Sequence, residues 1–402
     1  MRRHKSDRLI GILTIFLMGL GLIVIYAIGP MRASTLNYVY GNEDYSENYF
    51  FIRQAISVAL AVGAFFLFYK IPYAKVRLIA KWLVWIGLAL CLILAILAML
   101  NSSLANCQLG ACRWFSIGGI SLQPAEIVKF GLILYIAQLI STCKRNGTFD
   151  KFKDFWLPLL IVSGLSLFFT IVVQTDLGTG ISMIAIILVM LFVGGVPTRK
   201  FVIALAILLV GGILATVTSP HRMERIATFI GGDSSNSYHI ENAMIAIGSG
   251  GVLGVGVGNS VQATGYLPES INDSIFAVMG ETFGFIGLLV IVSCFTVLLL
   301  RLLRTSQQLP RSSEASLVVS GVFAWMAAHV LMNIATMIGL IPVTGITLPL
   351  LSYGGTSMVF ISSALGLCLQ LSCYTGREVI NEGISSRRGV RRAHYSGRRS
   401  RA

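Results

Sequence analysis

The chain has 402 residues, of which 55% are hydrophobic and only 12% are charged, and its mean hydropathy is +0.80. This composition excludes a soluble globular protein, because a soluble core cannot bury so much apolar surface. The net charge of +14 is compatible with nucleic-acid binding, but the positions of the basic residues favour a membrane topology instead.

Ten apolar stretches are long enough to cross a bilayer as helices, since one crossing takes ~20 mostly apolar residues. Basic residues precede the first stretch, as in a signal peptide, but no Ala-x-Ala-like cleavage site follows it, so we expect a retained helix. The sequence therefore predicts an all-α polytopic membrane protein with about ten transmembrane helices. The stretches are 9–28, 51–69, 82–100, 122–142, 156–173, 180–196 (the shortest), 201–219, 275–300, 317–340 and 356–375.

The basic residues predict the orientation, because positive charge is retained on the cytoplasmic side. With the N-terminus in the cytoplasm, the cytoplasmic segments hold 25 of the 31 Lys and Arg residues. The outer loops then hold only Arg32, Arg113, Arg222 and Arg225. We expect both termini in the cytoplasm, with a basic N-tail at 1–8, a membrane domain at 9–375 and a basic tail at 376–402.

The C-terminal tail is rich in arginine and low in apolar residues, so we expect it to be disordered. Attraction to anionic lipids, worth ~1 kcal/mol per basic residue, is the favoured role. A dedicated protein contact is the alternative.

Two of the seven cysteines, Cys107 and Cys112, fall in the expected outer loop 101–121. An oxidising exterior would allow them to form a disulfide across this short loop, and two free thiols are the alternative. The other five are expected to be small packing residues or inert thiols. They are Cys91, Cys143, Cys294, Cys368 and Cys373.

A long outer segment, 219–274, separates the seventh and eighth stretches and gives room for chemistry. It contains Arg222 and Arg225, followed by a glycine series between positions 248 and 258. The series lacks the Lys-Ser/Thr of a phosphate-binding loop and follows no predicted strand. A flexible loop whose backbone bends close to other helices is the favoured interpretation.

Ionisable residues inside membrane spans are costly and usually face a cavity or a partner. Glu126 and Lys129, three residues apart, fit either a structural ion pair or contact with a substrate. Glu281 has no basic neighbour in sequence, so it needs a tertiary partner or must be protonated. We expect His329 and Asn333, four residues apart, to make interhelical hydrogen bonds.

Asp273 directly precedes the apolar stretch 275–300. Taken alone, it is expected to cap that helix, because an Asp side chain accepts hydrogen bonds from first-turn amides. Catalysis is the alternative, and the sequence around Asp273 favours it through the resemblance described next.

Several strings spread over 9–375 resemble the SEDS family (shape, elongation, division and sporulation), which includes the bacterial FtsW and RodA proteins. They occur in the family's order, and the helix count and orientation also agree. The strings are 113–114 (RW), 123–129 (QPAEIVK), 174–179 (QTDLGT), 246–251 (AIGSGG), 267–269 (LPE) leading to 273–278 (DSIFAV), 339–345 (GLIPVTG) and 348–357 (LPLLSYGGTS).

The resemblance implies a peptidoglycan glycosyltransferase that polymerises lipid II at the outer face of the bacterial cytoplasmic membrane, with the family's essential aspartate at Asp273. The FtsW branch of division and sporulation is somewhat closer than the RodA branch of elongation. The chain departs from the family by having Cys112 for Arg, which would leave Arg113 to act alone on the pyrophosphate. The other departures are Thr175 for Pro, Asn242 for Gln, and Ile271 and Asn272 for His-Thr.

An inverting transfer from a lipid pyrophosphate needs one base and a stabilised leaving group. We expect Asp273 to be the base and Arg113, Arg222 or Arg225 to neutralise the pyrophosphate, with or without Mg²⁺ or Mn²⁺. Glu269 would raise the pKa of Asp273 or hold the cation. The remaining candidate substrate contacts are Glu126, Lys129, Ser352 and Tyr353.

Two other functions stay open. In a lipid II flippase, Glu126, Lys129 and Glu281 would form a polar route through the membrane, although no inverted repeat is visible. A non-catalytic division scaffold is the other. The family works with a class B penicillin-binding transpeptidase. The expected outer segments contain no Ser-x-x-Lys motif, so we expect that this chain does not crosslink peptides itself. We expect that partner, other divisome or elongation proteins, and no nucleic acid.

Overall fold

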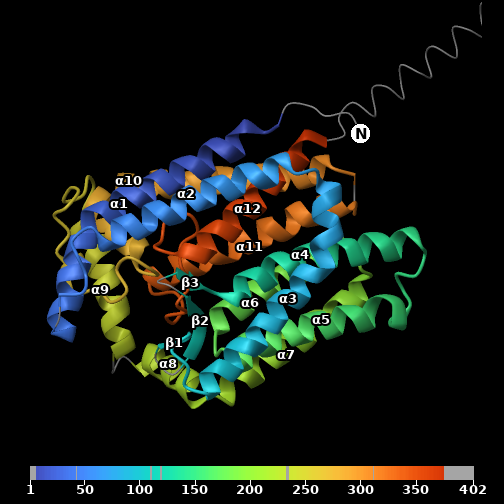
Figure 1. The fold of residues 1–402 in the computed structure, drawn as a ribbon, viewed down its shortest axis with the longest axis horizontal. Helices are drawn as coiled ribbons and strands as arrows, with labels where there is room; N and C mark the ends of the chain where they lie inside the picture. The colour runs from blue at the N-terminus through green and yellow to red at the C-terminus, as the bar shows by residue number, and fades with distance from the viewer. Residues whose placement is uncertain are drawn as a thin grey trace, which may run out of the picture.

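Long apolar helices make up most of the chain (Figure 1). The computed structural model describes residues 6–41, 43–108, 111–117, 120–231, 235–310 and 312–374. The basic tail 376–402 lies outside these residues, so the expected lipid contact of that tail stays a prediction.

The predicted number of membrane spans is confirmed for the described part of the chain. Nine helical segments there are long and apolar enough to span a membrane, and α6 is a shorter tenth. The spans are α1 (Arg8–Tyr40), α2 (Tyr49–Lys70), α3 (Tyr73–Met99), α4 (Pro124–Arg145), the segment Phe152–Val173 that contains α5 (Leu157–Leu167), α6 (Leu177–Val193), α7 (Thr198–Val217), α10 (Ile275–Gln308), α11 (Glu314–Met337) and α12 (Gly355–Leu371).

Helices α4, α11 and α12 form the buried centre of the bundle. Helix α2 packs along α12, α3 along α4, and both α6 and α10 along α11. A Cβ atom at Gly366 of α12 would collide with the carbonyl oxygen of Phe65 on α2, so these helices approach at a residue without a side chain, as membrane helices commonly do. Helix α7, by contrast, has no buried residue.

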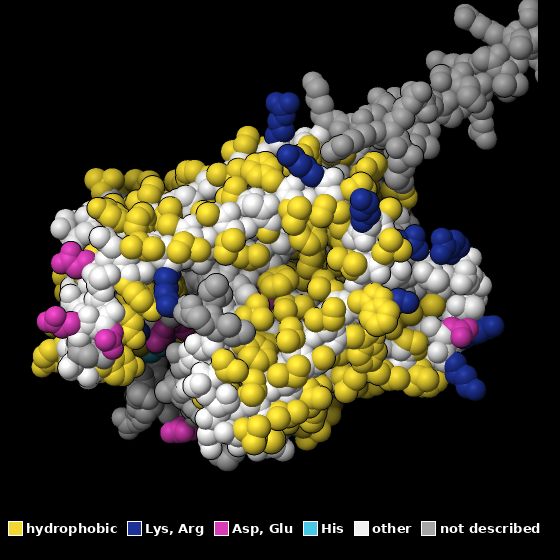
Figure 2. Space-filling model, viewed as in Figure 1, with side chains coloured by type: hydrophobic (Ala, Val, Ile, Leu, Met, Phe, Trp, Pro, Cys, Tyr) yellow, Lys and Arg dark blue, Asp and Glu magenta, His cyan; other side chains and the backbone are white. Residues whose placement is uncertain are grey.

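Charged side chains separate towards the two ends of the bundle (Figure 2). Most visible Lys and Arg side chains lie towards the end that carries the N-terminus, and most visible Asp and Glu side chains lie towards the other end, with an apolar surface between them. This distribution agrees with the charge bias seen in the sequence.

The end away from the N-terminus is more structured than the sequence predicted. The expected loop 101–121 contains a three-stranded antiparallel sheet, and the expected loop 219–274 contains two helices (Figure 1). Helix α1 also continues well beyond its apolar stretch. These added elements are β1 (Ala105–Gln108), β2 (Ala111–Ile117), β3 (Ile120–Leu122), α8 (Pro220–Gly231) and α9 (Ser235–Ser249).

Candidate active site

Asp273 lies at the end of a tight turn, 267–274, directly before α10. Its backbone is held from two directions. The amide of Asn333 on α11 donates to the carbonyl oxygens of Asp273 (2.6 Å) and Ile346 (2.7 Å). The backbone amide of Tyr353 donates to Ile271 (2.8 Å). The turn is therefore fixed by α11 and by the loop that precedes α12.

The Asp273 side chain is buried, and among the described residues no donor reaches its Oδ1 atom. The N-cap position of α10 belongs to Ser274, so the helix-cap interpretation of Asp273 is not what the structure shows. Burial, together with the nearby charge of Glu269, raises the pKa of Asp273 to about 7, against the opposing effect of nearby backbone amides and Arg225. A pKa near neutrality suits a general base.

Glu269 lies in the same turn and is half exposed. Its backbone φ is +48°, and the segment from Glu269 to Asp273 is a turn and not a helix. The Glu269 carboxylate accepts hydrogen bonds from Asn272 (2.5 Å) and from Arg32 of α1 (3.3 Å). It raises the pKa of Asp273, in line with one of its two predicted roles.

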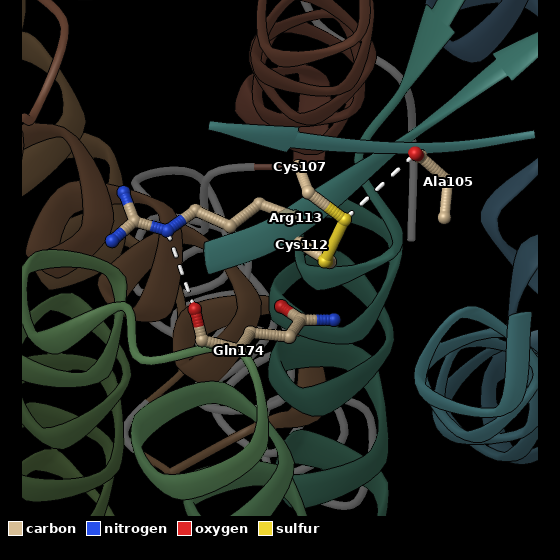
Figure 3. Close-up of a disulfide and its surroundings, with 5 residues drawn as sticks. All are labelled: Ala105, Cys107, Cys112, Arg113 and Gln174. Atoms are coloured by element: carbon tan, nitrogen blue, oxygen red, sulfur yellow. Dashed lines mark hydrogen bonds between the residues drawn. A yellow bond between two sulfur atoms is a disulfide. The ribbon is translucent and has the colours of Figure 1, made fainter. Parts of the chain in front are cut away.

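Three arginines that the sequence singled out interact electrostatically with one another, and Arg225 also interacts with Asp273. Arg113 on β2 donates to the carbonyl oxygens of Gln174 (3.3 Å) and Thr175 (3.0 Å) (Figure 3). Two more come from α8, and burial followed by repulsion from Arg113 lowers the pKa of both Arg222 and Arg225. The three guanidinium groups therefore lie within electrostatic range of one another.

The two α8 arginines are anchored through backbone oxygens. Arg222 donates to Ala215 (2.6 Å) and to Ile171, whose carbonyl lies in the π-helical turn Phe168–Val173. Arg225 donates to Val343 (3.3 Å). These acceptors are neutral, so the bonds to them do not cancel the charge of either guanidinium group.

Asp176 is a site residue that the sequence reasoning did not select. Its carboxylate caps α6 by accepting from the amide (3.0 Å) and hydroxyl (2.9 Å) of Thr179, and from Gln123 (3.3 Å). Its charge raises the pKa of Arg222 and of Arg225, opposing the effect of burial. The string 174–179 was the available signal, but it was read only as a family resemblance.

His239 on α9 was also missed. Its Nε2 atom lies 2.6 Å from the Ser274 hydroxyl, which itself donates to the Pro268 carbonyl (2.8 Å), so the imidazole is the donor. Burial lowers the pKa of His239, with Glu269 opposing this and Arg225 adding to it. A neutral imidazole thus holds the residue next to Asp273.

Glu126 and Lys129 on α4 form an ion pair of 2.6 Å that is enclosed by protein. The Lys129 ammonium also lies 3.2 Å from His329 Nε2 and 4.9 Å from the ring centre of Trp325 on α11. The predicted interhelical contact of His329 is thus present, whereas Asn333 bonds to loop carbonyls. Substrate contact by Glu126 and Lys129 stays a prediction.

The partner that Glu281 needed is a turn of the preceding loop, and among the described residues no basic side chain takes part in its hydrogen bonds. Its buried carboxylate accepts hydrogen bonds from the Ser260 hydroxyl (2.5 Å) and the Val261 amide (2.9 Å). Backbone amides and a hydroxyl therefore compensate this charge.

The glycine series packs against a break in α10 at Gly284, whose φ is +65°. The carbonyl of Glu281 accepts from the Val255 amide (2.9 Å), and the amide of Phe285 donates to Gly251 (2.9 Å). The interpretation that this backbone bends close to another helix is confirmed. The loop supplies hydrogen bonds that the broken helix cannot make itself.

Ser352 and Tyr353 lie in the loop before α12. The Ser352 hydroxyl accepts from the Leu348 amide (2.8 Å), and the Tyr353 ring packs edge-on against Phe50, with ring centres 5.5 Å apart. Both residues therefore have structural contacts, and their contact with substrate stays a prediction.

Cys107 and Cys112 are joined by a disulfide across the β1–β2 hairpin, with Cα atoms 4.0 Å apart. In Figure 3 the Arg113 side chain extends away from the two sulfur atoms towards Gln174. The disulfide thus fixes the position of Cys112, the residue directly before Arg113. Of the other cysteines, four are buried and Cys294 is partly exposed.

Comparison with known proteins places this arrangement in a family. The family model described as "Cell cycle protein", which covers FtsW, RodA and SpoVE proteins, matches residues 7–377. The chain belongs to this family. It is 33% identical to stage V sporulation protein E of Bacillus subtilis, over 93% of this chain and 99% of that protein. It is 30% identical to a probable peptidoglycan glycosyltransferase FtsW of Coxiella burnetii, over 92% of this chain and 96% of that protein.

Solved structures share the fold. A chain in a peptidoglycan synthase complex covers 92% of this chain and 99% of its own length, with a TM-score of 0.69 and 22% identity. The rod shape determining protein RodA of Thermus thermophilus covers 92% of this chain and 98% of its own length, with a TM-score of 0.65 and 23% identity. The chain is therefore a multi-pass membrane protein with a RodA-like fold.

Proposed function

We propose that this protein is a peptidoglycan glycosyltransferase that polymerises lipid II at the outer face of the bacterial cytoplasmic membrane during division or sporulation. The observation that carries the proposal is the Asp273 carboxylate, which is buried with an unpaired oxygen and has a pKa near 7, beside Arg225. Family membership and the activity named for the FtsW relatives support the same reaction.

In the proposed reaction, Asp273 takes the proton from the 4-hydroxyl of the acceptor sugar. The oxygen then forms a bond to the anomeric carbon of the donor while the bond from that carbon to the lipid pyrophosphate breaks, with inversion. Arg113, Arg222 and Arg225 stabilise the departing pyrophosphate anion. No second carboxylic acid is needed, because pyrophosphate leaves without being protonated.

A divalent cation fits this site only together with substrate. Among the described residues, no group of three or more His, Cys, Asp or Glu side chains is placed to hold a metal. Mg²⁺ often binds through one or two carboxylates plus substrate phosphates. Asp273 and Glu269 would supply those carboxylates, and the ion would add positive charge beside the pyrophosphate.

The proposed partner is a class B penicillin-binding transpeptidase. The similarity in fold to a chain of a peptidoglycan synthase complex supports an assembly of this kind. The proposed orientation, with both termini in the cytoplasm, places Asp273 on the side where such a partner would crosslink the new strands.

The decisive experiment is glycan polymerisation from lipid II by the purified protein, with and without its transpeptidase partner. Wild type is expected to make glycan, and Asp273→Asn is expected to make none while folding normally. Asp154→Asn, which changes an exposed carboxylate at the opposite end, is the matched control. Full activity of Asp273→Asn would overturn the assignment of the base.

The flippase and scaffold alternatives give different results in the same series. A flippase would transfer lipid II between leaflets without polymerising it, and Asp273→Asn would leave that transfer unchanged. In the described part of the chain, Glu126, Lys129 and Glu281 all bind partners within the protein, and no contact there favours a polar route. Glycan formed only in the presence of the partner, and unaffected by any acidic substitution in this chain, would indicate a scaffold.

A further inference from the structure

An apolar groove separates α7 from α5 and α6 at the end of the bundle that carries the N-terminus. Its volume is about 400 Å³. Each helix contributes residues three or four positions apart, which lie on one face of a helix. Such pairs are Leu160 and Ser163 of α5, Ile187 and Leu191 of α6, and Ala204 and Leu208 of α7.

The depth of the groove matches one leaflet of a bilayer. From Lys200 to Leu208 the helix rises ~12 Å, and half of the hydrocarbon core measures ~15 Å. Water is disfavoured there, because nearly all the lining is apolar. Since α7 has no buried residue, the described part of the protein does not fill the space.

The mouth of the groove carries charges and an aromatic ring. Lys200 pairs with Asp150 at 2.6 Å, and both side chains are at least a third exposed. The same ammonium lies 5.9 Å from the ring centre of Trp156, a residue type that favours the membrane interface. Deeper in the groove, the buried hydroxyl of Ser163 has no partner among the described residues.

We propose that this groove binds one acyl chain of a glycerophospholipid from the leaflet at the Lys200 end, with the lipid phosphate on Lys200. The apolar walls take the chain. The Lys200 ammonium has three donors, of which Asp150 takes one, so it can bind the phosphate while its exposed ion pair with Asp150 is kept. This site is separate from Asp273 and serves a structural lipid rather than the lipid-linked substrate.

The test is lipid binding by the full chain, purified and delipidated in detergent, measured by native mass spectrometry with phosphatidylglycerol as the probe. Wild type is expected to retain one lipid above non-specific attachment. Ala204→Trp fills the groove and is expected to abolish that binding. Ala206→Trp makes the same change on the exposed opposite side of α7 and is expected to bind like wild type. Equal binding by the two variants would overturn the proposal.

Two further variants test the groove and the phosphate contact separately. Leu160→Trp fills the groove from α5 and is expected to lose the lipid as well, which separates groove filling from local damage to α7. Lys200→Gln is expected to weaken phosphatidylglycerol binding about fivefold, equivalent to about 1 kcal/mol. Unchanged affinity in Lys200→Gln would contradict the proposed contact between Lys200 and the phosphate. Retention of lipid by Leu160→Trp would contradict binding in the groove.

Discussion

At the scale of single residues, the neighbours of Asp273 set its basicity. A carboxylate that is buried without a full set of donors favours its protonated form, and a second carboxylate nearby adds to that effect. Both causes operate on Asp273. Its reactivity is therefore a property of the turn 267–274 and not of an aspartate as such.

The pH dependence of polymerisation follows from this environment. Because the base must be deprotonated, the rate is expected to rise with pH through an apparent pKa of about 7 and then to level off. Glu269→Gln removes the nearby negative charge, so the rising limb is expected to move to lower pH. The measurement is the initial rate of glycan formation across pH.

Arg32→Gln is the paired control for that variant. It removes the ion-pair partner of Glu269 while keeping the carboxylate, so the rising limb is expected to stay in place or move to higher pH. A rising limb that moved to lower pH in both Glu269→Gln and Arg32→Gln would contradict the role given to Glu269.

His239 is expected to be a positioning residue. His239→Ala removes the donor to Ser274, a loss of about 1 kcal/mol for a neutral hydrogen bond or about fivefold in kcat. His239→Gln keeps an N–H donor and is expected to recover most of the rate. KM for lipid II should be unchanged in both variants. Equal losses in the Ala and Gln variants would show that the hydrogen bond does not matter.

At the scale of elements, the glycine loop completes the backbone hydrogen bonding of α10 where that helix is broken. The loop amides and carbonyls replace helical hydrogen bonds around Gly284, which lipid could not do. Gly254 has a φ of +84° and its Cβ would collide with the Thr282 carbonyl oxygen, whereas Gly258 has a φ of +87° and open space around it.

These two glycines give a matched pair of variants. Both Gly254→Ala and Gly258→Ala place a side chain at positive φ, which costs about 1–2 kcal/mol in each variant. Only Gly254→Ala also pushes the loop off α10, so its thermal unfolding temperature in detergent is expected to be lower than that of Gly258→Ala. Equal unfolding temperatures would show that the loop and α10 are not tightly coupled.

Hydropathy predicted the membrane spans because each span must satisfy its own backbone and expose apolar side chains to lipid. The same signal fails for β1 to β3, which are short strands held by pairing across the hairpin. It also fails for α8 and α9, which lie outside the apolar stretches. Charge, spacing and family strings selected Asp273 and the three arginines. His239 was not selected, since its contact with Ser274 joins residues 35 positions apart.

At the scale of the whole molecule, the disulfide reports on orientation. If β1 and β2 face an oxidising exterior, Cys107 and Cys112 are expected to be paired as isolated. In intact spheroplasts, a membrane-impermeant maleimide should label them only after reduction. Mass analysis of non-reduced peptides measures the pairing, and a Cys107→Ser and Cys112→Ser double variant is the control. Two free thiols in the isolated protein would contradict the pairing, and absence of labelling after reduction would contradict the orientation.

Helix α7 has a consequence for how the sequence can vary. A span without a buried residue is constrained by insertion into lipid and by little else, so its outer face can exchange one apolar residue for another over evolutionary time. The residues that line the groove and the link to α8 cannot drift as freely. An alignment of relatives should therefore show α7 as a helix with one conserved face, the face that turns towards α6 and the groove.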